Sequence, residues 1–300
     1  MIDYNMINSA MNIILNQNID DKINEKIIQN EELVYFLKEN KILIRFFDVL
    51  DGKNIKIKES IKRLLIKEKI RVKNVKLIID KIGLILKDYS ENYIVFKNFQ
   101  HFPDMGDDID LLIIDNHEKI LRLLINNFNV KLKEKTIFNK ISNKTMLIDF
   151  DNKFEIELHD NTLGRFGEFQ LNNLNLKDFV KIENGLCTPK IQFQMIINII
   201  QRIYTRSYIR VSEMMFFKEN TGLYEDNLFW SGIKSLNIIE GANLYEKLNS
   251  SFYEGRTKRM LESFNFKRNK YIKFENSIFY IKLRYSLPLI LKNILNKYKR

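Results

Sequence analysis

Residues 93–115, YIVFKNFQHFPDMGDDIDLLIID, decide the fold of this chain. The stretch begins with a run of β-branched and aromatic residues at 93–96, which predicts a strand. Pro103 and Gly106 mark the loop that follows, and the apolar run at 109–114 predicts a second strand. We therefore expect two strands joined by a loop at the centre of the molecule.

Two acidic residues lie at the start of the second predicted strand. Because side chains alternate along a strand, Asp108 and Asp110 point to one face and Ile109 points to the other. The two carboxylates are then separated by about 6.5 Å of strand rise, close enough to lean together and share one hard cation. We predict a metal-binding edge at the mouth of a sheet.

The composition limits the class of protein. A chain of 300 residues with 45% hydrophobic and 12% aromatic residues suits one large domain or two smaller ones with a proper core. The single cysteine, Cys187, excludes a disulfide framework and favours a reducing compartment, so we expect a cytoplasmic protein. No apolar run has the length of a membrane span, and the N-terminus lacks the pattern of a signal peptide.

The formal net charge of +11 and the pI near 9.4 leave two readings open. One is a soluble basic protein whose lysine excess follows from a composition rich in Ile, Asn and Lys. The other is a protein that handles polyanions, such as nucleoside triphosphates or nucleic acid. Basic residues are spread along the chain and form no single tract, so the charge alone favours neither reading.

The periodicity divides the chain into three regions. Residues 1–90 form a helical N-terminal region, 91–180 a core that carries the metal site, and 181–300 a mainly helical C-terminal region. Near the end of the first region we expect one helix that begins at 61–65 and a second that carries the apolar stripe at 75–89. We find no internal repeat and no low-complexity linker, which favours one continuous compact unit.

The middle of the chain predicts a helix and a hairpin. Asn116 is the expected cap of the helix, and two alternating runs at 145–150 and 154–159 predict two antiparallel strands. In the second run Glu157 and His159 share the polar face. A solvent-exposed sheet face explains this pattern for an isolated strand. After an Asp-x-Asp strand, the same face is also a candidate donor of a third carboxylate.

The C-terminal region is expected to be helical from Thr188 and Pro189, which suit the cap and first turn of a helix. Arg202, Arg206 and Arg210 follow at intervals of four, and this spacing predicts a basic stripe along one helix. The stripe is either a solvated face or a phosphate clamp that faces the site.

Further downstream we predict three features. Helices are expected within 225–250, a small hairpin is expected from 271–274 and 278–283, and an amphipathic segment is expected at 288–300.

An ordered set of motifs carries a family resemblance. The strand VFK at 95–97 precedes GDDIDLLI at 106–113, and the later strand ends IELH at 156–159. This set resembles the nucleotidyltransferase superfamily that includes polymerase beta. Within it, the chain is most similar, over residues 60–215, to a bacterial and archaeal family with helical N- and C-terminal regions. The resemblance implies an α/β fold (α+β), with a small mixed nucleotidyltransferase-type sheet flanked by helical regions.

The resemblance also implies an activity. A metal-dependent nucleotidyltransferase moves a nucleoside monophosphate from a nucleoside triphosphate (ATP or another NTP) to a hydroxyl of a small molecule, a protein or an RNA end. Mg²⁺ (or Mn²⁺) is the implied cofactor. In the implied roles Asp108 and Asp110 bridge two metal ions, while Glu157 holds the catalytic metal and accepts the proton of the attacking hydroxyl. Lys97 balances charge, and His159 lies behind the acids or faces the acceptor.

The chain also departs from the superfamily pattern. The Gly-Ser or Gly-Gly pair that binds phosphate after the first strand is replaced by Lys97 and Asn98, which leaves the Asn98 side chain as the donor. These departures leave open a non-catalytic nucleotide-sensing or partner-binding protein, or a basic nucleic-acid-binding module.

Clustered carboxylates repel one another without a cation, so we expect Asp110→Asn to leave the metal-free protein as stable or more stable.

Overall fold

The computed structural model describes most of the chain. The described residues are 4–16, 28–51, 56–98, 102–106, 108–134, 144–150, 154–164, 167–183, 185–206, 208–253, 272–273 and 291.

A five-stranded mixed sheet forms the centre, in the order β1-β2-β5-β4-β3, which confirms the predicted mixed α/β class. Its strands are β1 (Tyr93–Phe96), β2 (Asp108–Ile113), β3 (Val130–Leu132), β4 (Lys144–Asp149) and β5 (Glu155–Asp160). Strand β2 runs antiparallel to β1 and parallel to β5, and the predicted β4–β5 hairpin is antiparallel. Because β2 is an interior strand, all of its residues except Asp108 are buried, which explains its continuous apolar run.

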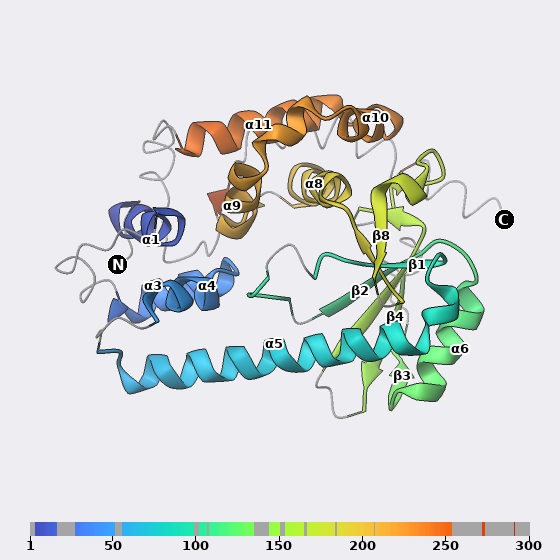
Figure 1. Cartoon of the computed structure of the whole chain (residues 1–300), viewed down its shortest axis with the longest axis horizontal. Helices are drawn as coiled ribbons and strands as arrows, with labels where there is room; N and C mark the ends of the chain where they lie inside the picture. Colours follow the sequence, from blue (N-terminus) through green and yellow to red (C-terminus); the bar gives the residue numbers. More distant parts are fainter. Residues whose placement is uncertain are drawn as a thin grey trace.

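The two faces of the sheet pack into different cores. Ile94, Phe96 and Leu112 belong to one cluster, whereas Val95 and Leu111 belong to the other, as the alternation of strand side chains requires. Figure 1 shows α5 on one side of the sheet and α8, α9 and α11 on the other. The face that carries Phe96 therefore points toward the C-terminal helices.

The N-terminal region contains α1 (Tyr4–Asn16), α3 (Glu31–Glu39), α4 (Leu43–Leu50) and α5 (Glu59–Ile85). The prediction of two helices after residue 58 is wrong, because α5 is continuous. No proline interrupts it, its only glycine lies near its end, and good helix formers fill its exposed face. A short 3₁₀ turn, Lys87–Tyr89, and not the helix itself, leads into β1.

The predicted helix after Asn116 is present as α6 (His117–Asn127). Asn116 occupies the cap position in a left-handed conformation, and its side chain makes no capping hydrogen bond.

The chain after the central sheet forms small hairpins, short helical turns and the C-terminal helices. These elements are β6 (Thr162–Leu163), β7 (Phe169–Gln170), η3 (Leu176–Phe179), β8 (Val180–Glu183), β9 (Leu186–Pro189), α8 (Ile191–Ile199), the π-helical turn η4 (Ile200–Thr205), β10 (Tyr208–Ile209), α9 (Val211–Glu219), η5 (Thr221–Glu225), α10 (Asn227–Ser235), α11 (Ile239–Tyr253) and β11 (Ile272–Lys273).

The prediction of a helix start at Thr188 and Pro189 is wrong. Both residues belong to β9, and α8 begins two residues after Pro189, with Lys190 at its cap position. The β8–β9 pairing captures them because Thr188 pairs with Lys181, and cross-strand pairing overrides a local capping signal.

The prediction at the C-terminus is met only in part. Strand β11 lies within the first run of the predicted hairpin and pairs with β10, which is distant in sequence. The second run of that hairpin, 278–283, lies outside the described residues, as does 288–300 apart from Leu291. The helices expected within 225–250 are present as α10 and α11.

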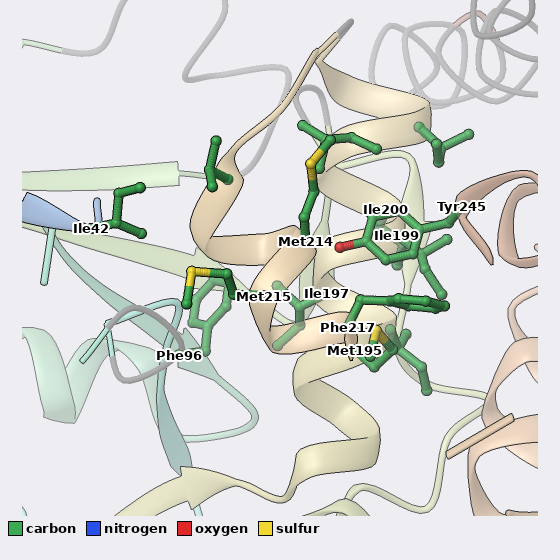
Figure 2. Packing of buried hydrophobic residues seen from close by; sticks show 14 of the residues in the cluster. Ile42, Phe96, Met195, Ile197, Ile199, Ile200, Met214, Met215, Phe217 and Tyr245 are labelled. Carbon is green, nitrogen blue, oxygen red and sulfur yellow. The ribbon is translucent and has the colours of Figure 1, made fainter. Parts of the chain in front are cut away.

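The N- and C-terminal helices share a single apolar cluster. It includes Ile42 before α4, Phe96 of β1, Ile197 of α8 and Met215 of α9. Figure 2 shows Met215 and Ile197 close to the ring of Phe96. This cluster holds the C-terminal helices against the sheet face that carries the acidic residues. Within the described part of the chain, no helix is both long and apolar enough to cross a membrane.

Candidate metal centre

The strand register brings the acidic residues together. In the parallel β2–β5 pair, Asp110 lies beside Glu157, and Leu112 lies beside His159. Because paired residues of parallel strands point the same way, these side chains share the face that carries Phe96. The predicted convergence of Asp110 and Glu157 therefore follows from the pairing of two strands that are far apart in sequence.

A histidine completes the cluster. Nε2 of His159 lies 2.8 Å from Oε2 of Glu157 and 2.9 Å from Oδ1 of Asp110. One ligand atom from each residue lies within 4.8 Å of the others. The side chain of His159 is only 2% exposed and that of Asp110 only 11%. This buried group could hold a metal ion.

The predicted trio and the observed cluster differ in one member. Asp108 lies at the exposed start of β2. Its partner on β5 is Glu155, whereas Glu157 is the partner of Asp110. Asp108 lines the same cavity, but its carboxylate is not part of the cluster, and His159 takes the third position. The sequence signal for His159 was its shared face with Glu157.

Two lysines neutralise the carboxylates. Nζ of Lys97 lies 2.6 Å from Oδ1 of Asp110 and 3.5 Å from Nε2 of His159, and it also lies 4.5 Å from the ring centroid of Phe96. Nζ of Lys144 lies 3.2 Å from Oε2 of Glu157. The expected repulsion left out these ion pairs, in which Asp110 and Glu157 each face an ammonium group.

The pKa values of the site reflect these contacts. Burial alone would raise the pKa of Glu157, but the hydrogen bond and charge of His159 and the charges of Lys144 and Lys97 hold it well below its usual range. Burial lowers the pKa of Lys144, and the positive charge of Lys97 adds to this effect. Glu157 is therefore a firm anion and a poor general base, which counts against its predicted role as proton acceptor.

Asn98 has a structural role. Its side chain is buried, Nδ2 donates to the carbonyl oxygen of Asp108 at 2.7 Å, and Oδ1 accepts from the backbone N–H of Asp110 at 3.3 Å. The amide thus joins the end of β1 to the start of β2. The two bonds fix the orientation of the amide, and the second N–H of Nδ2 is the donor that the predicted contact with a phosphate would use, since Asn98 lines the cavity into which the cluster opens.

The cluster opens into a cavity of about 300 Å³ between the sheet and the C-terminal helices. Its lining is rich in positive charge. The basic residues that line it are Lys41, Lys97, Lys144, Arg202, Arg206 and Arg210. The cavity is therefore suited to an anionic ligand.

The three arginines do not lie on one helix. Arg202 belongs to η4, Arg206 follows the end of η4, and Arg210 is the cap residue of α9. The prediction of a single helical stripe is wrong, because the helix ends at Thr205 and a short strand intervenes. All three arginines still line the cavity.

Arg202 is committed to a buried ion pair. Its Nε and Nη2 atoms lie 2.7 Å and 2.5 Å from Oε1 of Glu213, and its guanidinium lies 5.1 Å from the ring centroid of Tyr208. The side chain of Glu213 is fully buried. Arg202 thus joins η4 to α9. The sequence predicted that Arg202 binds a ligand, and it did not predict this structural contact.

Comparison with family models, with curated proteins and with solved structures finds no match to this chain.

Proposed function

We propose that this protein is a metal-dependent nucleotidyltransferase, which moves a nucleoside monophosphate from a nucleoside triphosphate to a hydroxyl acceptor. The observation that carries the proposal is the cluster of Asp110, Glu157 and His159 on paired strands, open to a basic cavity. Nucleotidyl transfer requires few covalent steps from the protein, and it depends on positioning and charge neutralisation. Carboxylates beside ammonium groups meet both needs.

The donor set supports a divalent cation as the cofactor. Asp110 and Glu157 supply the oxygen ligands that Mg²⁺ prefers, while the imidazole nitrogen of His159 favours Mn²⁺. Nε2 of His159 lies against one oxygen of each carboxylate, so it is the ring nitrogen that would bind the ion. The bound ion would neutralise charge on the phosphates. Lys97 and Lys144 can supply ammonium groups to the same phosphates.

Asn98 and the lysines favour a second candidate function on the same fold. The Asn98 amide is engaged by the backbone, and both carboxylates are paired with ammonium groups. A protein that binds a nucleoside triphosphate without turning it over would retain the basic cavity under these conditions. Binding without pyrophosphate release distinguishes this nucleotide sensor from the enzyme.

Turnover of labelled triphosphates tests the proposal. The protein is incubated with each α-labelled NTP and with Mn²⁺ or Mg²⁺, and pyrophosphate release and label transfer are measured. We expect metal-dependent release that Asp110→Asn and Glu157→Gln abolish.

Glu155→Gln is the matched control for these variants. Glu155 lies on the same strand as Glu157 and pairs with Lys133 at 3.1 Å outside the cavity, so its loss should leave turnover unchanged. Turnover that survives Asp110→Asn would reject the metal centre, and metal-dependent triphosphate binding without any release would favour the sensor.

A further inference from the structure

We propose that Lys97 and Lys144 are exchangeable counter-ions of the acid cluster, which a phosphate chain draws away so that a divalent cation can enter. The inference rests on the proposed function, because it assumes that the cluster binds a metal ion and that the cavity binds phosphate. It adds that the two ligands bind cooperatively, and it assigns the cooperativity to two named side chains.

The distances show that the metal position and the lysine contacts overlap. Oδ1 of Asp110 accepts from Lys97, and Oε2 of Glu157 accepts from Lys144; these same two oxygens face His159. An ion bound between the three side chains would need these oxygens. An ammonium group and a divalent cation cannot both lie against one oxygen without strong repulsion.

The charge balance predicts cooperativity. The cluster contains two carboxylates and two ammonium groups, so it is neutral in its present form, apart from His159. A divalent cation alone would leave excess positive charge in a largely buried site, and a phosphate chain alone would find Lys97 and Lys144 already paired with carboxylates. When both bind, the cation compensates the carboxylates and the lysines compensate the phosphates.

The lysines are placed to exchange partners. The side chains of Lys97 and Lys144 are 19% and 16% exposed, and both line the cavity. A lysine carries a compact charge on a flexible stem of four carbons. The ammonium can therefore move from a carboxylate to a phosphate within the same cavity. The buried guanidinium of Arg202 lacks this freedom because two of its nitrogens contact Glu213.

Metal binding without phosphate provides the first test. The full chain is titrated with Mn²⁺ alone, and free Mn²⁺ is followed by electron paramagnetic resonance. We expect Lys97→Met and Lys144→Met each to raise Mn²⁺ affinity by about tenfold, a usual size for coupling between sites. The Gln variants of the same lysines replace any Met variant that fails to fold.

Lys133→Met is the matched control. Lys133 also pairs with a glutamate of β5, Glu155, but this pair lies outside the cavity, so Mn²⁺ affinity should not change. Unchanged or weaker Mn²⁺ binding in both cavity variants overturns the proposal.

Phosphate binding without metal provides the reciprocal test. Tripolyphosphate is titrated separately, in the presence of a chelator and by calorimetry, because it binds Mn²⁺ in solution. We expect Lys97→Met and Lys144→Met to weaken its binding, and Asp110→Asn to strengthen it by about tenfold by releasing Lys97. Unchanged tripolyphosphate affinity in Asp110→Asn contradicts the exchange.

The failure of this inference differs from failure of the proposed function. If the lysine variants behave as expected and no triphosphate is turned over, the exchange stands and the enzyme assignment fails. If turnover is metal-dependent but lysine replacement leaves Mn²⁺ affinity unchanged, the function stands and the exchange is wrong. If neither wild type nor the lysine variants bind Mn²⁺, and no triphosphate is turned over, both are overturned.

Discussion

Individual residues of the site work in oppositely charged pairs. Asp110 faces Lys97, and Glu157 faces Lys144, while His159 bridges the two carboxylates. The Asp-x-Asp pattern in the sequence identifies acidic residues of the site, but it does not identify the lysines that pair with them. The stability of the site without a metal therefore depends on ion pairing within the chain.

Asp110→Asn should destabilise the metal-free protein, which reverses the expectation from the sequence. The variant removes the charge that faces Lys97 and His159, and a partly buried ammonium loses its partner. We expect the free energy of unfolding to fall by about 1 to 3 kcal/mol. Urea denaturation in the presence of a chelator measures the change.

Glu155→Gln provides the comparison for this change. Glu155 is on the neighbouring strand, 35% exposed and paired with an exposed lysine, so the variant should stay within about 0.5 kcal/mol of wild type. If Asp110→Asn is as stable as wild type or more stable, the expectation that the carboxylates repel one another in the metal-free protein is supported instead.

At the scale of elements, the turn from η4 to α9 places arginines with different roles around the cavity. Arg202 is buried against Glu213, whereas Arg206 is exposed at the end of η4 and lines the cavity. The backbone N–H of Arg210 donates to Oε2 of Glu213 at 3.0 Å, so one carboxylate holds both sides of the turn. Equal spacing in sequence thus gives unequal environments.

Arg202→Gln and Arg206→Gln should therefore separate structure from binding. Loss of Arg202 leaves the fully buried Glu213 without its cation, and we expect a loss of about 3 to 5 kcal/mol in the free energy of unfolding. Arg206→Gln should change stability by less than about 0.5 kcal/mol and weaken tripolyphosphate binding. Thermal denaturation and calorimetry measure the two effects, and equal destabilisation by both variants would contradict the assignment.

On the scale of the whole molecule, a buried acid ties the N-terminal helices to the loop before β2. Oδ1 of Asp104 accepts from the backbone N–H of Ile44 at 2.7 Å, and Oδ2 accepts from that of Arg45 at 3.0 Å. The carboxylate thus caps the start of α4 from a position 60 residues away. Arg71 of α5 donates to the carbonyl oxygens of Met105 and Gly106, which fixes the same loop.

This contact predicts a pH dependence of stability. Burial raises the pKa of Asp104 from 3.8 to about 6, although the backbone donors Ile44 and Arg45 oppose the shift. The folded state therefore binds this proton more tightly than the unfolded state. The contribution to stability is full below about pH 4 and is lost as the pH rises through about 6.

Asp104→Asn measures this contribution, since asparagine has nearly the same shape and does not titrate. We expect the free energy of unfolding of wild type relative to the variant to fall by about 1 to 3 kcal/mol between pH 4 and pH 7. Urea denaturation at several pH values provides the comparison. A relative stability that rises with pH would show that the ionised form is the one that the fold favours.

Local sequence patterns determined many of the elements of this protein. The β-rich run at 93–96 and the apolar run at 109–114 predicted both strands, and the alternating runs on either side of residue 152 predicted the β4–β5 hairpin. The helix after Asn116 followed from its apolar periodicity. These features depend on neighbours within a few residues, so period and turn chemistry suffice to predict them.

Only the tertiary structure decided the composition of the site. Asp110 and His159 lie 49 residues apart in sequence, and the parallel register of β2 and β5 brings them into contact. Alternation tells which side chains share a face of one strand, but it does not tell which strands are neighbours or in what register. The lysine partners, the committed Asn98 amide and the buried Arg202 follow from that pairing and from burial. Both are set by long-range packing, which no local pattern encodes.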